Sequence, residues 1–258
     1  MGVNNTFSTS LTGMNGLQTQ LDIVANNVSN SNTTGYKTQQ ASFSELLNKD
    51  ITEDVTEDEQ PLAVNMGVKV TSGEADYSQG TISETGVSTD FAINGNGFFG
   101  VTDTSGNLYL TRDGDFSFDA NGDLVNSQGY KVSMNATVPT NQWPSGTLNV
   151  SSNGEMSINT GTESVQVGQL AIYEPSSLSS LINRGDNLYS VATGTTLNSN
   201  LNGATDLGSI KQGALESSNV DLASEMSNLI IAQRAYSLNS QMLKSNDDMW
   251  ESINSFNS

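Results

Sequence analysis

The sequence predicts a mixed α and β protein, in which paired N- and C-terminal heptad helices lie around a β-rich middle domain. Apolar residues recur every seven positions at both ends, and short apolar runs alternate with turn-forming clusters in the middle. Only 34% of the 258 residues are apolar, so we do not expect one core to fill the whole chain. The predicted division is 1–36 for the N-terminal helix and an Asn-rich turn, 37–66 for an acidic connecting segment, 67–215 for the β-rich domain and 216–258 for the C-terminal helix.

The N-terminal helix is expected over residues 4–30. Its apolar positions follow a heptad pattern, in which Leu17 and Val24 lie three residues after members of the main row. An Asn- and Thr-rich stretch that ends at Gly35 is expected to stop the helix, because these side chains compete for backbone hydrogen bonds. The main row is Phe7, Met14, Leu21 and Val28.

The chain between the helices changes character twice. Residues 45–60 hold one lysine among many carboxylates, which indicates a solvated linker or the exposed face of a short helix. After residue 67, short β-prone runs alternate with clusters of Asn, Asp, Ser and Gly, which is typical of an antiparallel sandwich or an irregular barrel. The expected strands are 68–71, 91–93, 98–101, 109–111 and 116–118, and the expected turns are 94–97, 103–107, 119–123 and 152–155.

The C-terminal helix is expected over residues 219–256. We expect Asn219 to be its N-cap, with Asp221 in the first turn, where a negative charge is favourable. The heptad row runs for about five heptads, longer than most globular helices. That row is Leu222, Leu229, Tyr236, Leu243 and Trp250, and beside it lie Met242, Met249 and Phe256.

Pairing of the two end helices alone is expected to be weak. Burial of one apolar row contributes less free energy than the ordering of a helix of this length costs in conformational entropy. We therefore expect the ends to be mobile in the monomer and ordered by neighbouring copies. Trypsin should then leave a stable fragment near 70–211, cutting outside it at Lys37, Lys49, Arg234 and Lys244.

Composition excludes several classes of function. The chain has no His and no Cys, which removes His-based triads, thiol nucleophiles, Fe–S clusters and most zinc sites. There are 28 acidic and 9 basic residues, and a net charge of −19 argues against nucleic-acid and anionic-lipid surfaces. We expect no integral membrane segment and no ordinary cleavable signal, since no apolar run approaches the length of a membrane span and the N-terminus lacks a basic region.

Three motifs that suggest chemistry are better explained as structure. Residues 95–100 read G-x-G-x-x-G, but two Phe and a Val follow, so the pattern indicates a hairpin and strand and not a nucleotide site. Asp119, Asn121 and Asp123 resemble the start of a calcium loop but lack its later Gly and Glu, so a turn is the better interpretation. No pair of carboxylates stands out as a glycosidase pair from the acidic background. We predict no catalytic, metal or cofactor site.

Both ends and one internal segment resemble the axial proteins of the bacterial flagellum, the rod and hook family. The N-terminal match is Leu17 to Lys37, with an Ala-Asn-Asn run followed by Asn-Thr-Thr-Gly-Tyr-Lys. The other matching segments are 90–99, 111–114, 129–130, 213–222 and 232–236.

The resemblance implies a structural, self-assembling subunit of the basal-body rod, most like the distal rod, whose terminal helices form an inner coiled-coil tube that transmits torque. It implies no enzyme activity and no cofactor. It also implies export without a cleavable signal to the flagellum outside the cytoplasm. The implied partners are other copies of the chain, other rod and hook proteins and the flagellar export apparatus. A proximal rod protein, a short hook-type protein and, remotely, a secreted carbohydrate-binding or carbohydrate-cleaving β protein remain alternatives.

The resemblance also implies which residues act in assembly. Asn26, Asn27, Asn30, Asn32 and Gly35, in and beside the Asn-rich turn, are expected to close the first helix and to pack against neighbours. Asn219 and Asp221 are expected to start the second helix. Gln233, Arg234 and Tyr236 are expected to face other subunits or the first helix, although Tyr236 is equally well explained as heptad core. The remaining candidates are Leu17, Leu21, Val24, Leu222, Leu229 and Leu243.

Overall fold

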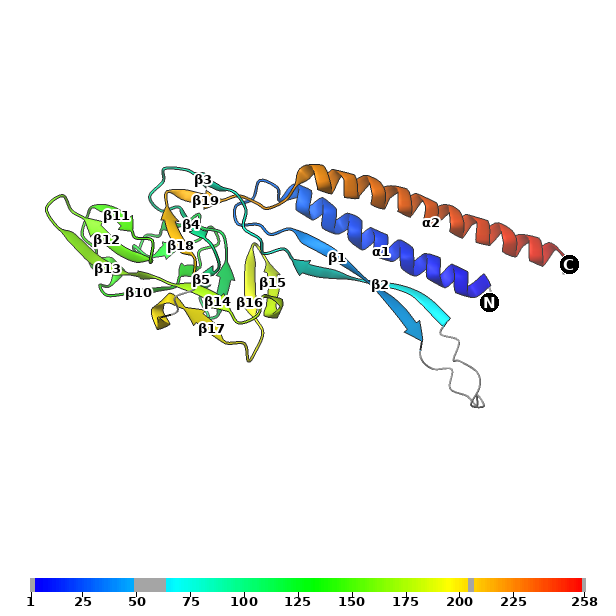
Figure 1. Ribbon diagram of the computed structural model, residues 1–258, viewed down its shortest axis with the longest axis horizontal. Helices are drawn as coiled ribbons and strands as arrows, with labels where there is room; N and C mark the ends of the chain where they lie inside the picture. Colours follow the sequence, from blue (N-terminus) through cyan, green and yellow to red (C-terminus); the bar gives the residue numbers. More distant parts are fainter. Residues whose placement is uncertain (1–2, 49–63, 204–206, 257–258) are drawn as a thin grey trace. The chain divides into compact units, whose positions relative to one another are not determined.

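The computed structural model describes residues 3–48, 64–203 and 207–256 (Figure 1). The predicted class is confirmed, because the chain has one α-helix near its N-terminus, one near its C-terminus, and mostly β-strands between them. The chain folds into two compact units, each built from separate stretches of sequence. The helical unit contains 1–29, 39–76 and 220–258, and the β-rich unit contains 30–38 and 77–219.

The helical unit contains two long helices and a hairpin. Helix α1 (Val3–Ser29) and helix α2 (Leu222–Phe256) lie side by side and antiparallel (Figure 1). Their bounds differ by at most three residues from the predicted 4–30 and 219–256. Strands β1 (Gln39–Asn48) and β2 (Val64–Ala75) form an antiparallel hairpin that packs on α1.

The hairpin was predicted only in part. The expected strand 68–71 lies within β2, but it belongs to the helical unit and not to the β-rich domain, and its partner β1 was not expected. Strand β1 lies inside the predicted connecting segment 37–66, whose part from 49 to 63 is outside the described residues. Gly16 of α1 shows how closely the helix and the hairpin pack. A Cβ there would lie 2.5 Å from Cγ2 of Val70 in β2. A residue that weakens the helix therefore allows the hairpin to approach it.

The β-rich unit is antiparallel in every pairing of its described strands. One branched sheet has nine strands, and a second has four in the order β10-β13-β12-β11. The bounds of the larger sheet are β5 (Phe98–Thr102), β6 (Leu108–Thr111), β7 (Ser117–Phe118), β8 (Leu124–Val125), β9 (Lys131–Val132), β14 (Ile172–Pro175), β15 (Leu181–Gly185), β16 (Leu188–Val191) and β17 (Leu197–Ser199). Those of the smaller one are β10 (Met134–Ala136), β11 (Thr147–Val150), β12 (Glu155–Asn159) and β13 (Ser164–Leu170).

The first and last strands of the β-rich unit pair with each other. Strand β3 (Ile82–Glu84) pairs with β19 (Ala214–Glu216), and β4 (Phe91–Asn94) pairs with β18 (Ser209–Gln212). Three short 3-10 turns complete the unit, Thr140–Gln142, Leu178–Ser180 and Asn200–Asn202. The unit is thus closed by residues near its C-terminal end.

The core of the β-rich unit consists of aromatic and branched aliphatic side chains from many short strands. Phe91, Phe99 and Phe116 are buried together at its centre. The predicted turns at 103–107 and 119–123 are confirmed, since an aspartate at the start of each accepts backbone N–H bonds from within the turn. Residues 95 and 96 form a bend, and the strands beside it, β4 and β5, pair with β18 and β6 and not with one another.

No helix in the described part of the chain is both long enough and apolar enough to cross a membrane.

Candidate functional site

The segment that follows α1 is bound into the β-rich unit by hydrogen bonds. Asn30 accepts both the backbone N–H and the hydroxyl of Thr33, each at 3.1 Å, which closes the turn after the helix. Thr34 donates its hydroxyl to Oδ1 of Asp113 at 2.7 Å and accepts Nδ2 of Asn187 on its carbonyl at 3.0 Å. The expected role of the Asn-rich turn in closing the first helix and in packing against neighbours stays a prediction.

Gly35 makes the closest backbone contact in this segment. Its φ is +65°, in the left-handed region, and its N–H donates to the carbonyl of Glu216 at 2.8 Å. A Cβ at this position would lie 2.4 Å from the backbone N of Asp113. Only glycine therefore fits here without moving the backbone.

Three charged side chains meet inside the β-rich unit, and we call them the Glu216 cluster: Lys37, Arg112 and Glu216. Lys37 Nζ lies 2.7 Å from Glu216 Oε1, and Arg112 Nη1 lies 3.1 Å from Glu216 Oε2. The exposed fractions of these side chains are only 1%, 5% and 1% in sequence order. Lys37 was expected to be an accessible trypsin site outside the β domain, and its burial in this cluster corrects that expectation.

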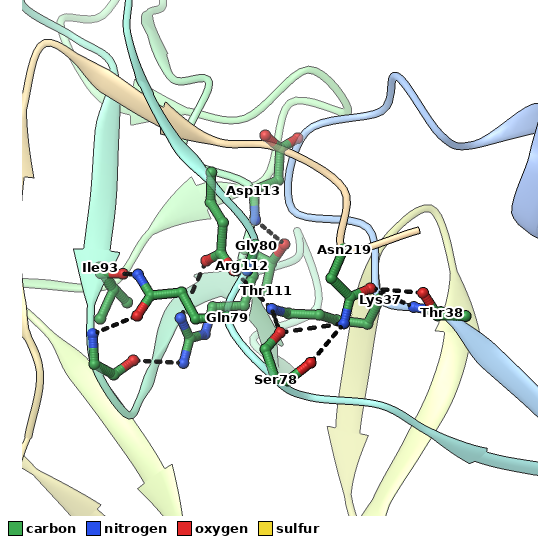
Figure 2. A network of polar contacts seen from close by, with 12 residues as sticks. Lys37, Thr38, Ser78, Gln79, Gly80, Ile93, Thr111, Arg112, Asp113 and Asn219 are labelled. Atoms are coloured by element: carbon green, nitrogen blue, oxygen red, sulfur yellow. Dashed lines mark hydrogen bonds and ion pairs between the residues drawn. The ribbon is translucent and has the colours of Figure 1, made fainter. Parts of the chain in front are cut away.

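Hydrogen bonds complete the surroundings of the cluster (Figure 2). Lys37 donates to the carbonyl of Ser78 at 2.6 Å, and the N–H of Gly80 donates to Glu216 Oε1 at 2.8 Å. Arg112 donates from Nη2 to the carbonyl of Gly95 at 2.8 Å. Its guanidinium carbon lies 5.1 Å from the centre of the Phe98 ring, a cation–π contact. Arg112 Nε is buried without a hydrogen-bond partner among the described residues.

Asn219 has a different role from the predicted one. Its Oδ1 accepts the backbone N–H and the hydroxyl of Thr38, both at 2.8 Å, and its Nδ2 donates to the carbonyl and the hydroxyl of Ser78 (Figure 2). The N-cap of α2 is Asp221, whose Oδ1 accepts the N–H of Ala223 at 2.9 Å and of Ser224 at 3.4 Å. Asp221 immediately precedes the first helical residue, so its side chain reaches the open N–H groups, whereas Asn219 binds the segment at Thr38 instead.

A second buried polar group lies between the helices of the helical unit. Asn27 donates from Nδ2 to Glu225 Oε1 at 3.2 Å and to the carbonyl of Gln39 at 2.8 Å, and it accepts the N–H of Gln39 at 3.0 Å. Both side chains are buried, and Val24 is buried beside them. Asn27 thus joins α1, α2 and the start of β1.

The remaining candidate residues divide between the seam of the two helices and the surface. On α1, Leu17 and Leu21 are half-buried and Asn26 is exposed, and Asn32 is exposed in the turn that follows. On α2, the half-buried candidates are Leu229, Tyr236 and Leu243, and the exposed ones are Leu222, Gln233 and Arg234. Leu229, Tyr236 and Leu243 are spaced by seven residues along the seam of α2, and the buried residues Glu225, Ala232 and Asn246 lie three or four residues from them.

Most large apolar residues of α2 lie outside the seam. We call them the outer apolar face of α2, and they are between 46% and 64% exposed. One row is spaced by four residues, and the other by seven, four and seven. The two rows are Leu222, Met226 and Ile230, and Ile231, Leu238, Met242 and Met249.

One carboxyl group beside the Glu216 cluster has a perturbed pKa. Burial raises the pKa of Asp113 above its ordinary value of 3.8, although the hydrogen bond from Thr34 opposes this. Nearby Asp115 and Asp90 raise it further. Burial also raises the pKa of Tyr189, so this phenol stays protonated at neutral pH.

Sequence reasoning did not assign a role to Arg112, Glu216 or Glu225. The first two lie in the segments that carry the family resemblance, but nothing in their spacing indicates that 104 residues of chain fold back to pair them. Among the described residues, no group of three or more possible metal ligands is present.

Comparisons with known proteins agree with the segments that the resemblance used. Residues 7–37 match the model of flagella basal body rod proteins, 92–168 match the D1 domain of the flagellar hook protein FlgE/F/G family, and 211–256 match the C-terminal model of flagellar basal body rod FlgEFG proteins.

Rod proteins among the relatives align with almost the whole chain. The flagellar basal-body rod protein FlgG of Buchnera aphidicola from Acyrthosiphon pisum is 35% identical, over 95% of this chain and 96% of its own length. That of Borreliella burgdorferi is 36% identical, over 93% and 94%. The flagellar hook protein FlgE of Escherichia coli is 35% identical, but over only 56% of this chain and 34% of the hook protein. The chain therefore belongs to the flagellar rod and hook family of axial proteins, and within it is most like the basal-body rod protein FlgG.

Proposed function

We propose that this protein is a structural, self-assembling subunit of the flagellar basal-body rod, most like the distal rod, and that its copies build a helical tube which transmits torque. Its family consists of structural proteins and not of enzymes. Torque would pass through many repeated lateral contacts between copies, so no single catalytic or ligand site is needed.

The outer apolar face of α2 is the observation that carries this proposal. Seven large apolar side chains on one helix are roughly half exposed, which is costly for a protein that stays monomeric in water. The two rows lie on either side of the seam with α1, as their spacing along the helix requires. Each α2 can therefore pack on its own α1 and on helices of two neighbours, as in a multi-stranded coiled coil.

The coverage of the relatives favours a rod subunit over a hook-type subunit. Rod relatives align over almost their whole length, whereas the hook protein of Escherichia coli has only 34% of its length in common with this chain. A hook-type or proximal rod role remains the second candidate within the same family.

The partners, the location, the export route and the lack of a cofactor are proposed from what the family implies. The partners would be further copies, other rod and hook proteins and the flagellar export apparatus. The chain would reach the flagellum outside the cytoplasm through that apparatus, without a cleaved signal, and would need no cofactor.

The assembly contacts can be tested by introducing charge into the outer apolar face. We expect the double substitution Ile231→Asp with Leu238→Asp to abolish motility and rod formation in a strain that lacks the wild-type protein. Both side chains are largely exposed in the monomer, at 64% and 62%, so its helix content and melting temperature should change little. Isolated basal bodies viewed by electron microscopy give the direct measurement.

The double substitution Gln241→Asp with Ser245→Asp is the matched control, because it adds the same two negative charges at exposed polar positions of α2. It should leave motility intact. Normal rods from the double variant would contradict the proposal, as would normal rods from a chain without residues 222–256.

A further inference from the structure

The β-rich unit is completed by two segments that lie far from its centre in sequence. Residues 30–38 directly precede the β1–β2 hairpin, and residues 209–219 lie just before α2. The Glu216 cluster takes one charge from each segment, Lys37 from the first and Glu216 from the second. Arg112, just after β6, supplies the third charge from within the unit.

Glu216 supplies the negative charge that both cations of the cluster contact. Two buried cations, Lys37 and Arg112, share the one carboxylate, and its oxygens also accept the N–H of Gly80. Without Glu216, two like charges would remain in a site from which water is almost excluded. Removing the carboxylate from a buried ion pair is strongly destabilising, and here the two cations that it contacts would also repel each other.

Backbone contacts link the placement of Glu216 to that of both segments. When β19 pairs with β3, β18 also pairs with β4, and the carbonyl of Glu216 accepts the N–H of Gly35. Asn219 then accepts the N–H of Thr38. The last strands, the incoming segment and the charge cluster are thus held by one continuous set of contacts.

We propose that the Glu216 cluster is a charge lock that makes the β-rich unit fold only when residues 30–38 and 209–219 are both in place. When the chain emerges gradually from one end, the β-rich unit would then stay unfolded until both residue 37 and residue 216 have emerged. The lock delays folding of a large central unit until most of the chain is available, whichever end appears first.

The test uses the full-length chain with Trp250→Phe as the background. Trp143 is then the only tryptophan, and it reports on the β-rich core, against which it packs. Urea unfolding is followed by its fluorescence, and hydrogen exchange with mass spectrometry follows residues 30–38 and strand β5. The test variants are Glu216→Gln and the double Lys37→Met/Glu216→Gln.

Glu84→Gln is the matched control. Glu84 in β3 pairs with Lys211 in β18 at 2.7 Å, so this pair also joins the start of the unit to its closing strands. Its side chains are 77% and 47% exposed, and exposed pairs contribute little to stability. The control therefore removes a similar link without exposing an unpaired buried charge.

We expect Glu216→Gln to lower the equilibrium constant for folding by at least about 100-fold. Exchange protection should fall together in residues 30–38 and in β5. Adding Lys37→Met removes one of the two repelling cations and should recover at least about tenfold of the loss. Glu84→Gln should stay within about threefold of the background protein.

Two results would overturn the proposal. If Glu216→Gln releases residues 30–38 while β5 and Trp143 keep their protection and signal, the segment is a detachable strap. If Lys37→Met brings no recovery, Glu216 acts through its shape and not its charge. Should Glu216→Gln fail to fold at all, a folded double variant supports the lock and an unfolded one contradicts it.

Discussion

Gly35 brings the segment after α1 into direct backbone contact with the turn that carries Arg112 and Asp113. Its left-handed φ and its N–H bond to Glu216 both depend on the absence of a side chain. Gly35 therefore meets two requirements at once, a left-handed backbone and the absence of a Cβ. It lies in the N-terminal segment that resembles the flagellar family.

We predict that Gly35→Ala destabilises the β-rich unit by more than the about 1–2 kcal/mol that the left-handed conformation costs an L-residue. The added Cβ must also move the backbone of Arg112 or Asp113. Urea unfolding followed by tryptophan fluorescence measures the loss. Gly129→Ala is the control, because its φ is +82° but no atom lies within 4 Å of the new Cβ. Equal losses in the two variants would show that the close contact is unimportant.

Asp113 gives a prediction about pH. Its folded-state pKa is raised, so the folded protein holds this proton more tightly than the unfolded chain does. Its contribution to stability is fully present below its ordinary pKa of 3.8 and is lost as the pH rises through the raised value. At neutral pH the ionised group is therefore destabilising.

Asp113→Asn should be more stable than the wild type at pH 7, since it keeps an oxygen for Thr34 but cannot ionise. The difference should shrink as the pH falls towards 4, because Asp113 becomes protonated. Urea midpoints of both proteins between pH 7 and pH 4 measure it. The lowered pKa values of exposed Asp103 and Asp119 affect both proteins equally and cancel in the comparison. A difference that is constant or grows on acidification would contradict the prediction.

At the scale of elements, the seam of α2 towards α1 includes two buried polar residues among its apolar ones, and further apolar rows lie beside it. Glu225 and Asn246 are buried on the seam, and each keeps one polar atom without a hydrogen-bond partner among the described residues. Polar residues at such positions weaken a helix pair but fix its register. The pair is therefore suited to correct alignment and relies on neighbours for further stability.

Asn246→Leu should stabilise the helical unit by about 1–3 kcal/mol, the cost of a buried polar group without a partner. The loss of helical circular dichroism on heating measures the change. Ser245→Leu is the control, because it adds the same side chain at the preceding, exposed position and buries nothing. If Asn246→Leu is neutral or destabilising, Nδ2 makes a favourable contact in solution that the static structure lacks.

At the scale of the whole molecule, both units are discontinuous in sequence, which changes the expected digestion pattern. Trypsin should leave the bond after Lys37 intact in the folded monomer, because that side chain is 1% exposed and ion-paired. Arg234 and Lys244 are exposed on α2 and should be cut if the helices open in the monomer, as their weak pairing predicts.

Mass spectrometry of a digestion time course provides the measurement. The expected resistant product contains an uncut Lys37 and the strands up to Glu216, and is not the fragment near 70–211. Arg184, which is exposed in β15, serves as an internal reference for cleavage within the β-rich unit. Early cleavage at Lys37 would show that the incoming segment is not held in the monomer.

The sequence by itself was sufficient for the local features. Heptad spacing located both helices to within three residues, and Asp- and Asn-led turns marked the boundaries of short strands, because these signals depend on neighbours a few residues apart. The same segments also identified the family.

Only the tertiary structure decided how distant residues meet. The β1–β2 hairpin, the binding of Asn219 to Thr38 and the pairing of Lys37 with Glu216 depend on contacts that no local pattern encodes. Lys37 and Glu216 are 179 residues apart, and each looks like an ordinary surface charge in the sequence. The burial of these two side chains and their ion pair exist only in the folded chain, because both depend on the interior that the strands enclose.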